Sequence, residues 1–213
     1  MSKFIRKDPI FFGAYLVFLL IACWYLLEYS RVDSLIWVNG HNSKGLDLFF
    51  KYYTNLANGL VMVILCIILF PINKWYGWMA ALTFGLTSLI SVFLKQVVFP
   101  DMPRPLAVVK DPGLLHLVDG VDVHLTNSFP SGHTITAFSL AVLLTYIVNN
   151  RALSKVLLLY AIAIAYSRMY LAQHFLIDAT AGSMIGVIFT WVSIAIVEKI
   201  RAKKKGKILE EKS

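Results

Sequence analysis

Charged side chains are scarce in this sequence, and acidic residues are the scarcest of them. Asp, Glu, Lys and Arg together make up 15% of its 213 residues, against about 25% in a typical soluble domain. Hydrophobic residues make up 58% and come in long runs that few charges interrupt. This composition excludes an ordinary soluble domain and indicates an integral membrane protein.

Cysteine is rarer still. Cys23 and Cys66 are the only two, and each lies inside an apolar run with no His, Cys or carboxylate nearby at metal-ligand spacing. The sequence therefore offers no thiolate metal site. We interpret both cysteines as packing residues.

Long apolar runs predict an all-α bundle of six transmembrane helices in a single domain that covers residues 1–213. The fourth run is short, but Pro130 can start its helix early and Gly132 lets its first turn approach other backbone. In the last run, Gly182 and Gly186 form a small-x-x-x-small face that suits close helix packing. The six runs cover residues 10–27, 54–71, 75–94, 134–148, 153–170 and 177–197.

The first run follows a basic segment, residues 1–7, as the apolar part of a signal peptide would. It is as long as a membrane span, however, and lacks a small-x-small cleavage site. We therefore expect this run to remain in the protein as its first helix.

The basic residues are divided unequally between the two sides of the predicted bundle. Six spans place both termini on one side, which carries 13 of the 20 Lys and Arg residues and leaves 7 for the other. The excess predicts that both termini are cytoplasmic. The basic tail, at about residues 198–213, would be attracted to anionic lipids, and a nucleic-acid partner is not expected. The residues on the terminal side are Lys3, Arg6, Lys7, Lys74, Arg151, Lys155, Lys199, Arg201, Lys203, Lys204, Lys205, Lys207 and Lys212.

Two segments on the outer side are long enough to have structure of their own. Within residues 28–53 and just beyond, apolar side chains recur at helical spacing. This pattern fits a short helix in the membrane interface and equally an ordinary loop with an aromatic belt. Residues 95–129 contain four prolines, so we expect an irregular loop there. The helically spaced residues are Leu46, Phe49, Phe50, Tyr53 and Leu56.

His174 and Asp178 form the first candidate catalytic pair. Residues four apart share one face of a helix. A carboxylate there can accept the ring N–H of the histidine and fix its tautomer. The other ring nitrogen is then a lone-pair nucleophile or base.

Three cations gather near this pair. Arg168 lies at the outer end of the fifth run, and the loop after the third run brings Lys95 and Arg104 to the same place. Three positive side chains around one spot match a dianionic phosphate, which Arg binds through two parallel hydrogen bonds and Lys as a point charge.

A second cluster begins the fourth helix. The backbone N–H groups of Ser131 and Gly132 can contact the same anion at the helix N-terminus. His133 sits where a proton donor for a leaving oxygen would sit. The plain alternative is that these polar residues only anchor helix ends in the interface. That reading explains the arginines but not the two histidines and the aspartate that accompany them.

A metal site has few candidate ligands. Asp119, Asp122, His116 and His124 are the only ones, and a solvated polar loop accounts for them better than a metal centre. We therefore expect neither a metal nor another cofactor.

The sequence resembles the type 2 phosphatidic acid phosphatases, integral-membrane lipid phosphatases related to vanadium haloperoxidases and bacterial acid phosphatases. That family has three motifs, Lys-x6-Arg-Pro, Pro-Ser-Gly-His and Ser-Arg-x5-His-x3-Asp. The second motif is complete at Pro130 to His133, and the third is complete from Ser167 to Asp178. The first departs from the pattern, because eight residues rather than six separate Lys95 from Arg104.

The resemblance implies a role for each matching residue. His174 would attack phosphorus to form a phosphohistidine, Asp178 would orient and stabilise it, and His133 would protonate the leaving group. The remaining positions would bind the phosphoryl oxygens and stabilise the transition state. They are Lys95, Arg104, Ser131, Gly132 and Arg168.

The resulting prediction is metal-independent hydrolysis of a phosphomonoester or pyrophosphate on a membrane lipid. The candidate substrates are undecaprenyl pyrophosphate, phosphatidate or phosphatidylglycerol phosphate, and lipid A phosphate. Two alternatives stay open, namely a lipid phosphotransferase with an acceptor other than water and a non-enzymatic lipid-phosphate binding or transport protein. The expected location is a bacterial inner membrane, with the site at the rim that faces the periplasm or the outside.

Overall fold

The computed structural model describes residues 8–210, with side chains up to residue 206. All regular structure in this part of the chain is helical, so the predicted all-α class is confirmed. Lys3, Arg6, Lys7 and Lys212, which contribute to the predicted charge asymmetry, lie outside the described residues, and the side chain of Lys207 is not described either.

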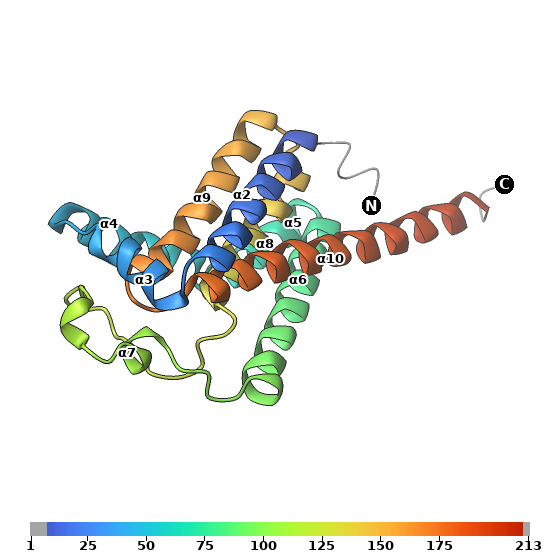
Figure 1. The fold of residues 1–213 in the computed structure, drawn as a ribbon. Helices are drawn as coiled ribbons and strands as arrows, with labels where there is room; N and C mark the ends of the chain where they lie inside the picture. The colour runs from blue at the N-terminus through green and yellow to red at the C-terminus, as the bar shows by residue number, and fades with distance from the viewer. Residues whose placement is uncertain (1–7, 211–213) are drawn as a thin grey trace.

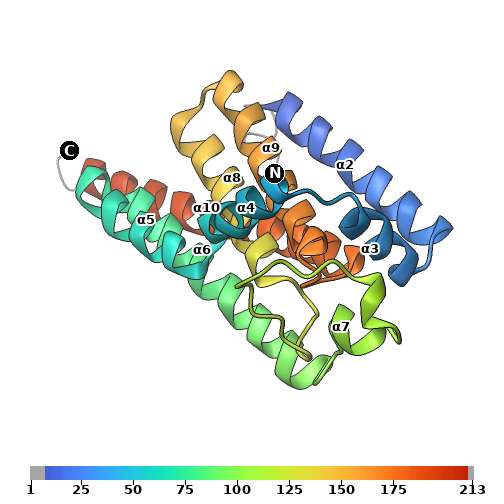
Figure 2. The ribbon, with the colours of Figure 1, turned by 90° about the vertical axis from the view of Figure 1, so that its left-hand side faces the viewer.

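Each predicted apolar run forms a long helix (Figures 1 and 2). The long helices are α2 (Pro9–Glu28), α5 (Gly59–Ile72), α6 (Lys74–Phe93), α8 (Gly132–Val148), α9 (Arg151–Tyr170) and α10 (Leu176–Glu210). The shorter helices are α3 (Arg31–Gly40), α4 (Lys44–Tyr53) and α7 (Pro105–Val108). Single helical turns complete the order, with η1 at Thr54–Ala57, η2 at Leu94–Val98 and η3 at Pro112–Leu114.

Four helices are long and apolar enough to cross a membrane by themselves, and a fifth span is formed if the bent segment made by α4, η1 and α5 is counted as one. The helix formed by the second predicted run is shorter than expected. The first residues of this run form η1, and the side chain of Asn58 then caps the start of α5 by accepting from Leu60 N. The bend between the two parts is 49°. Helix α8 has 17 residues and is therefore about 25 Å long, somewhat less than the ~30 Å hydrocarbon core of a bilayer.

Helix α8 is the centre of the bundle. It packs against α9 on one side and α10 on the other, and ten of its residues are buried (Figures 1 and 2). Helix α2 at the periphery has the opposite character, with only three buried residues and large exposed apolar side chains such as Leu16 and Leu20. Apolar side chains that face outward from a helical bundle suit contact with lipid.

Close packing between α8 and α10 depends on two glycines. A Cβ atom at Gly182 would lie 2.8 Å from the carbonyl oxygen of Ser131, and one at Gly186 would lie 2.6 Å from that of Ile135. Both distances are well below van der Waals contact, so only glycine allows the helices to approach this closely. The predicted small-x-x-x-small face is confirmed.

The basic tail continues the last helix. Helix α10 runs through the predicted end of the span to Glu210 and projects from the bundle (Figure 1). Near this end the Lys204 ammonium lies 5.8 Å from the ring centre of Trp75, at the start of α6. The start of α6 and the tail therefore lie at the same end of the bundle.

Helices α3 and α4 and the loop after α6 cover the C-terminal end of α9. Residues 44–53 are helical, which settles the choice between helix and loop, and Phe50 packs on Tyr166 and Tyr170. Buried Asn39 on α3 donates hydrogen bonds to the carbonyl oxygens of His116 and Tyr170. The loop after α6 is largely irregular, as predicted.

We expect Gly186→Ala to destabilise the protein, because the added methyl group meets a backbone carbonyl that cannot move alone. Overpacking of this kind costs about 1 to 3 kcal/mol. Gly85→Ala on α6 is the control, since a Cβ there meets nothing within 4 Å, and it should leave the thermal unfolding temperature in detergent unchanged or raise it. Equal unfolding temperatures for both variants would contradict this account of the α8–α10 contact.

Candidate active site

The five residues between Arg168 and His174 form a turn that closes on itself. Helix α9 ends at Tyr170, and Ala172 takes a left-handed conformation with φ of 50°. The backbone N–H groups of Gln173 and His174 then both donate to the carbonyl oxygen of Arg168, at 2.9 and 3.1 Å. This turn, which spans the five residues between the Arg and the His of the third motif, places His174 next to Arg168.

Asp178, on the first turn of α10, accepts two hydrogen bonds on the oxygen that lies nearest to His174. Its Oδ2 atom lies 3.4 Å from His174 Nδ1 and accepts hydrogen bonds from Ser128 Oγ at 2.5 Å and Phe175 N at 2.9 Å. His174 and Asp178 are both almost fully buried. The structure therefore brings the predicted histidine and carboxylate together and adds Ser128, which the sequence analysis did not single out.

Arg168 is a buried cation with an unused donor. Its Nη1 atom donates to the hydroxyl of Thr54 at 2.6 Å, whereas Nε has no hydrogen-bond partner among the described residues. The side chain is only 5% exposed. A buried guanidinium with a free N–H is costly unless a ligand completes its hydrogen bonds.

Lys95 and Arg104 lie side by side despite their unusual spacing. Lys95 lies in the wide turn η2, in which Phe99 N donates to Leu94 O. The carbonyl oxygen of Asn127 accepts from Lys95 Nζ at 2.6 Å and from Arg104 Nη2 at 3.5 Å. The turn and the following loop thus accommodate the two extra residues.

Gln173 holds the guanidinium of Arg104. Arg104 Nη1 donates to the side-chain oxygen of Gln173 at 3.0 Å, and Nε donates to Thr126 O at 2.8 Å. Gln173 in turn donates from Nε2 to Asp122 O at 2.9 Å. Arg104 is therefore oriented by groups from two segments, and its pKa is lowered by burial while Asp178 opposes the shift.

The second motif begins α8 against α10. The side chain of Ser131 is fully buried and caps the helix at Thr134 N, while the backbone N–H of Ser131 donates to Asp178 O at 3.1 Å. Gly132 and His133 face an open cavity next to this contact. Ser131 thus lies behind the cavity wall, and Gly132 and His133 are part of the wall.

These residues surround one cavity of about 410 Å³. Six of the eight predicted site residues line it, and Asp178 and Ser131 lie behind it. Lys51, Thr54 and Gln173 also contribute, although the sequence analysis missed them. Gln173 could have been predicted, because it directly precedes His174 in the third motif. Lys51 and Thr54 could not, because no sequence spacing connects them to the motifs. The six predicted residues are Lys95, Arg104, Gly132, His133, Arg168 and His174.

The environment of His174 keeps its imidazole neutral. Burial lowers the pKa of His174 to about 3, and the positive charges of Arg168 and Arg104 act in the same direction, while Asp178 opposes them. Near pH 7 the ring therefore carries a lone pair, as a nucleophile or base requires.

The four candidate metal ligands of the loop, His116, Asp119, Asp122 and His124, do not converge on one point. His116 Nε2 lies 2.9 Å from Asp47 Oδ1, and the backbone oxygen of Asp119 accepts from Lys51 Nζ at 2.6 Å. Asp122 and His124 lie at the cavity wall. Within residues 8–210, no group of three His, Cys, Asp or Glu side chains is placed to hold a metal ion.

The arrangement defines a class of protein, a helical integral membrane protein with a cavity lined by cationic side chains and two histidines. The family model of the PAP2 superfamily matches residues 76–202, more than half of the chain, and the chain belongs to this superfamily.

Individual relatives agree with this assignment. The crystal structure of Aquifex aeolicus LpxE is 30% identical, covers 79% of this chain and 97% of its own, and superposes with a TM-score of 0.69. The lipid A 4'-phosphatase of Bacteroides thetaiotaomicron is 27% identical over 183 residues, 82% of this chain and 80% of that protein. A transmembrane PAP2-type phosphatidylglycerolphosphate phosphatase from Bacillus subtilis shares the fold, with a TM-score of 0.63 at 22% identity and coverage of 94% of this chain and 98% of its own.

We expect Ser128→Ala to weaken the structure around Asp178. The variant removes a hydrogen bond to a buried carboxylate, and bonds to charged groups contribute about 1.5 to 3 kcal/mol. Thermal unfolding in detergent measures the loss. Ser139→Ala is the control, because its hydroxyl donates only a long 3.5 Å bond to Gly186 O. A Ser128→Ala protein as stable as the control would show that this hydrogen bond adds nothing.

Proposed function

We propose that this PAP2-type lipid phosphatase hydrolyses a phosphomonoester or pyrophosphate on a membrane lipid through a phosphohistidine formed on His174. The observation that carries the proposal is the buried, neutral imidazole of His174, which faces Asp178 through Nδ1 and lines a cavity with four cationic side chains. A neutral imidazole held in this way is an activated nucleophile.

In the first step, Nε2 of His174 attacks phosphorus and the bond to the leaving oxygen breaks. Asp178 holds the ring through Nδ1 and stabilises the positive charge that develops on it. His133, protonated once the negative charge of the bound phosphate offsets the surrounding cations, donates a proton to the departing oxygen. In the second step, water gives a proton to His133 and attacks the phosphorus of the phosphohistidine. The P–N bond breaks, inorganic phosphate leaves, and both imidazoles return to their starting states.

The cations stabilise the charge of the transferred phosphoryl group, which is the main catalytic task in phosphoryl transfer. Arg168, Lys95 and Arg104 all line the cavity, and the Nε–H of Arg168 has no other partner among the described residues. The backbone at Gly132 lies at the N-terminal end of α8, where the helix dipole favours an anion. Because these groups meet the phosphate charge, we propose that the reaction needs no metal.

A lipid substrate is supported by the lipid phosphatase activities of the relatives and by the position of the cavity, which lies at the end of α6, the end of α9 and the start of α10. The candidates from the sequence remain undecaprenyl pyrophosphate, phosphatidate or phosphatidylglycerol phosphate, and lipid A phosphate. A phosphotransferase would produce a phosphorylated acceptor instead of free phosphate, so product analysis separates the two reactions. A binding or transport protein would not need the neutral His174 beside Asp178.

We further propose six spans in one domain, with both termini in the cytoplasm and the cavity at the opposite face of a bacterial inner membrane. The basic residues Lys74 and Arg151 support this orientation, because they begin α6 and α9 while the cavity lies at the other ends of these helices. The bent segment and the short helix α8 would be the second and fourth spans.

The mechanism predicts that His174→Ala abolishes phosphate release while the protein stays folded. Asp178→Asn should keep a small residual rate, because the side chain keeps its size but no longer stabilises the imidazolium. Rapid quench of wild-type protein with lipid substrate should trap a phosphoenzyme that is labile in acid and stable in base. Near wild-type turnover by His174→Ala would refute the mechanism.

The first motif is tested by comparing its two cations. Since Lys95 and Arg104 share one carbonyl partner at the cavity, we expect both Lys95→Ala and Arg104→Ala to lower kcat/KM about ten- to a hundredfold, as for loss of one charge-assisted contact. Lys110→Ala, an exposed loop cation outside the cavity, is the control. A silent Lys95→Ala beside an impaired Arg104→Ala would remove Lys95 from the site.

A further inference from the structure

A second cavity adjoins the first. Its volume is about 280 Å³, and it lies between α5, α6 and α8. Gly132 and His133 line both cavities, so the second one begins where, on the proposed function, the leaving oxygen is protonated. The lipid part of the leaving group must extend away from the cavity that holds the phosphate, and this groove is continuous with that cavity.

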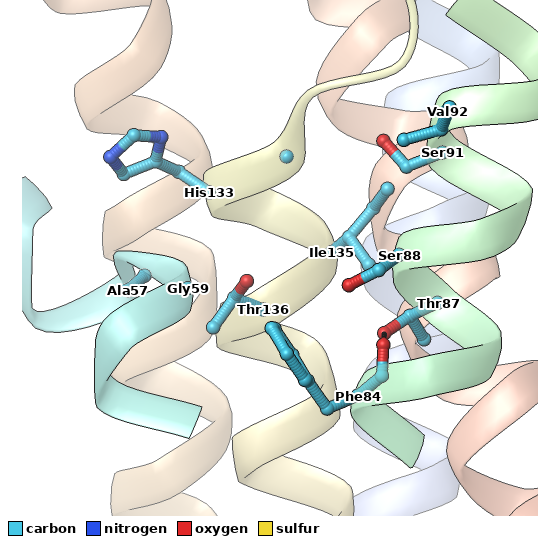
Figure 3. Close-up of a pocket in the computed structure, with 11 residues that line it drawn as sticks. Ala57, Gly59, Phe84, Thr87, Ser88, Ser91, Val92, His133, Ile135 and Thr136 are labelled. Carbon is cyan, nitrogen blue, oxygen red and sulfur yellow. Dashed lines mark hydrogen bonds between the residues drawn. The ribbon is translucent and has the colours of Figure 1, made fainter. Parts of the chain in front are cut away.

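The groove is lined by hydroxyl groups at membrane depth. Figure 3 shows Ser88 and Ser91 pointing from α6 toward α8, with Phe84 at the lower end of the groove. His133 lies at the start of α8, and its ring points away from α6. The α6 residues that line it recur at positions 84, 87, 88, 91 and 92, which is one helical face about 12 Å long. Thr136 on α8 adds a further hydroxyl to the wall.

Three of these hydroxyls are open to the groove and have no partner among the described residues. Within residues 8–210 the side chains of Ser88, Ser91 and Thr136 make no hydrogen bond, although all three are half-buried. Thr87 differs, because its hydroxyl donates to the carbonyl oxygen of Thr83 at 2.8 Å. Hydroxyl groups that face a groove without a protein partner can donate hydrogen bonds to a ligand that brings acceptors there.

The position of the hydroxyls indicates which acceptors fit. Thr136 is three residues beyond His133, about 4.5 Å further along α8. In an acylated lipid phosphate, the first ester or amide carbonyl lies only four or five covalent bonds from the phosphate. In undecaprenyl pyrophosphate the leaving group has acceptors only on its own phosphate, which lies two covalent bonds from the attacked phosphorus, and the chain beyond that phosphate is pure hydrocarbon without an acceptor along the groove. The groove therefore matches acylated lipids better than isoprenoid ones.

We propose that the Ser88, Ser91 and Thr136 groove is a specificity subsite that donates hydrogen bonds to acyl carbonyl groups of the leaving lipid. The inference rests on the proposed function, because it places the leaving group beyond His133. It narrows the substrate to an acylated lipid phosphate, in which the carbonyl belongs either to a glycerol ester or to an acylated sugar.

The test compares wild-type protein with the triple variant Ser88→Ala, Ser91→Ala and Thr136→Val on four substrates in mixed micelles. Phosphatidate and lipid A carry acyl carbonyls on glycerol and sugar respectively. The dialkyl ether analogue of phosphatidate and undecaprenyl pyrophosphate carry none. Ser193→Ala is the control, a buried hydroxyl on α10 that donates to Phe189 O outside the groove.

We expect wild-type protein to have its highest kcat/KM on one of the acyl substrates, which identifies the source of the carbonyl. The triple variant should lower that value tenfold or more and change the acyl-free substrates less than twofold. An acyl-free substrate equal to or better than both acyl ones in wild type, or an equal loss on all four in the triple variant, would overturn the inference and leave the phosphatase reaction intact. No phosphate release from any of the four would overturn both proposals.

Discussion

The Oδ2 atom of Asp178 joins the parts of the cavity wall. It accepts from Ser128, in the loop before α8, and from the backbone of Phe175, in the connection before α10, and it faces His174. One buried carboxylate thereby fixes two segments that lie 50 residues apart. Because a buried carboxylate is stable only when its oxygens have partners, these segments must keep their places for the fold to persist.

Helix packing makes this arrangement possible. The contact between α8 and α10 is close enough for Ser131 N to donate to Asp178 O, and it is close because Gly182 presents no side chain to the backbone of Ser131. The glycine face therefore does more than stabilise the bundle, since it sets the distance between the second and third motifs. In the proposed mechanism, that distance places His133 and His174 on opposite sides of the transferred phosphoryl group.

The two cavities have different roles in the proposed reaction. Cations line the larger one, where phosphate charge must be balanced, and hydroxyl groups line the smaller one, where charge would be unfavourable but hydrogen bonding to a lipid carbonyl is not. His133 lies at their boundary. In this proposal the larger cavity carries out the reaction common to all lipid phosphates, the smaller one distinguishes one lipid from another, and His133 lines both.

Local spacing in the sequence was sufficient for the apolar helices, the glycine face and the pairing of His174 with Asp178, because each depends on residues within a few helical turns. It was not sufficient for the length of α5, which begins later than expected because Asn58 caps it, or for Thr54, whose hydroxyl accepts from Arg168, 114 residues further along the chain. The sequence by itself determined which side chains carry the proposed chemistry. Only the tertiary structure decided that Lys95 reaches the cavity, because a wide turn and a shared carbonyl, invisible in the spacing, set its direction.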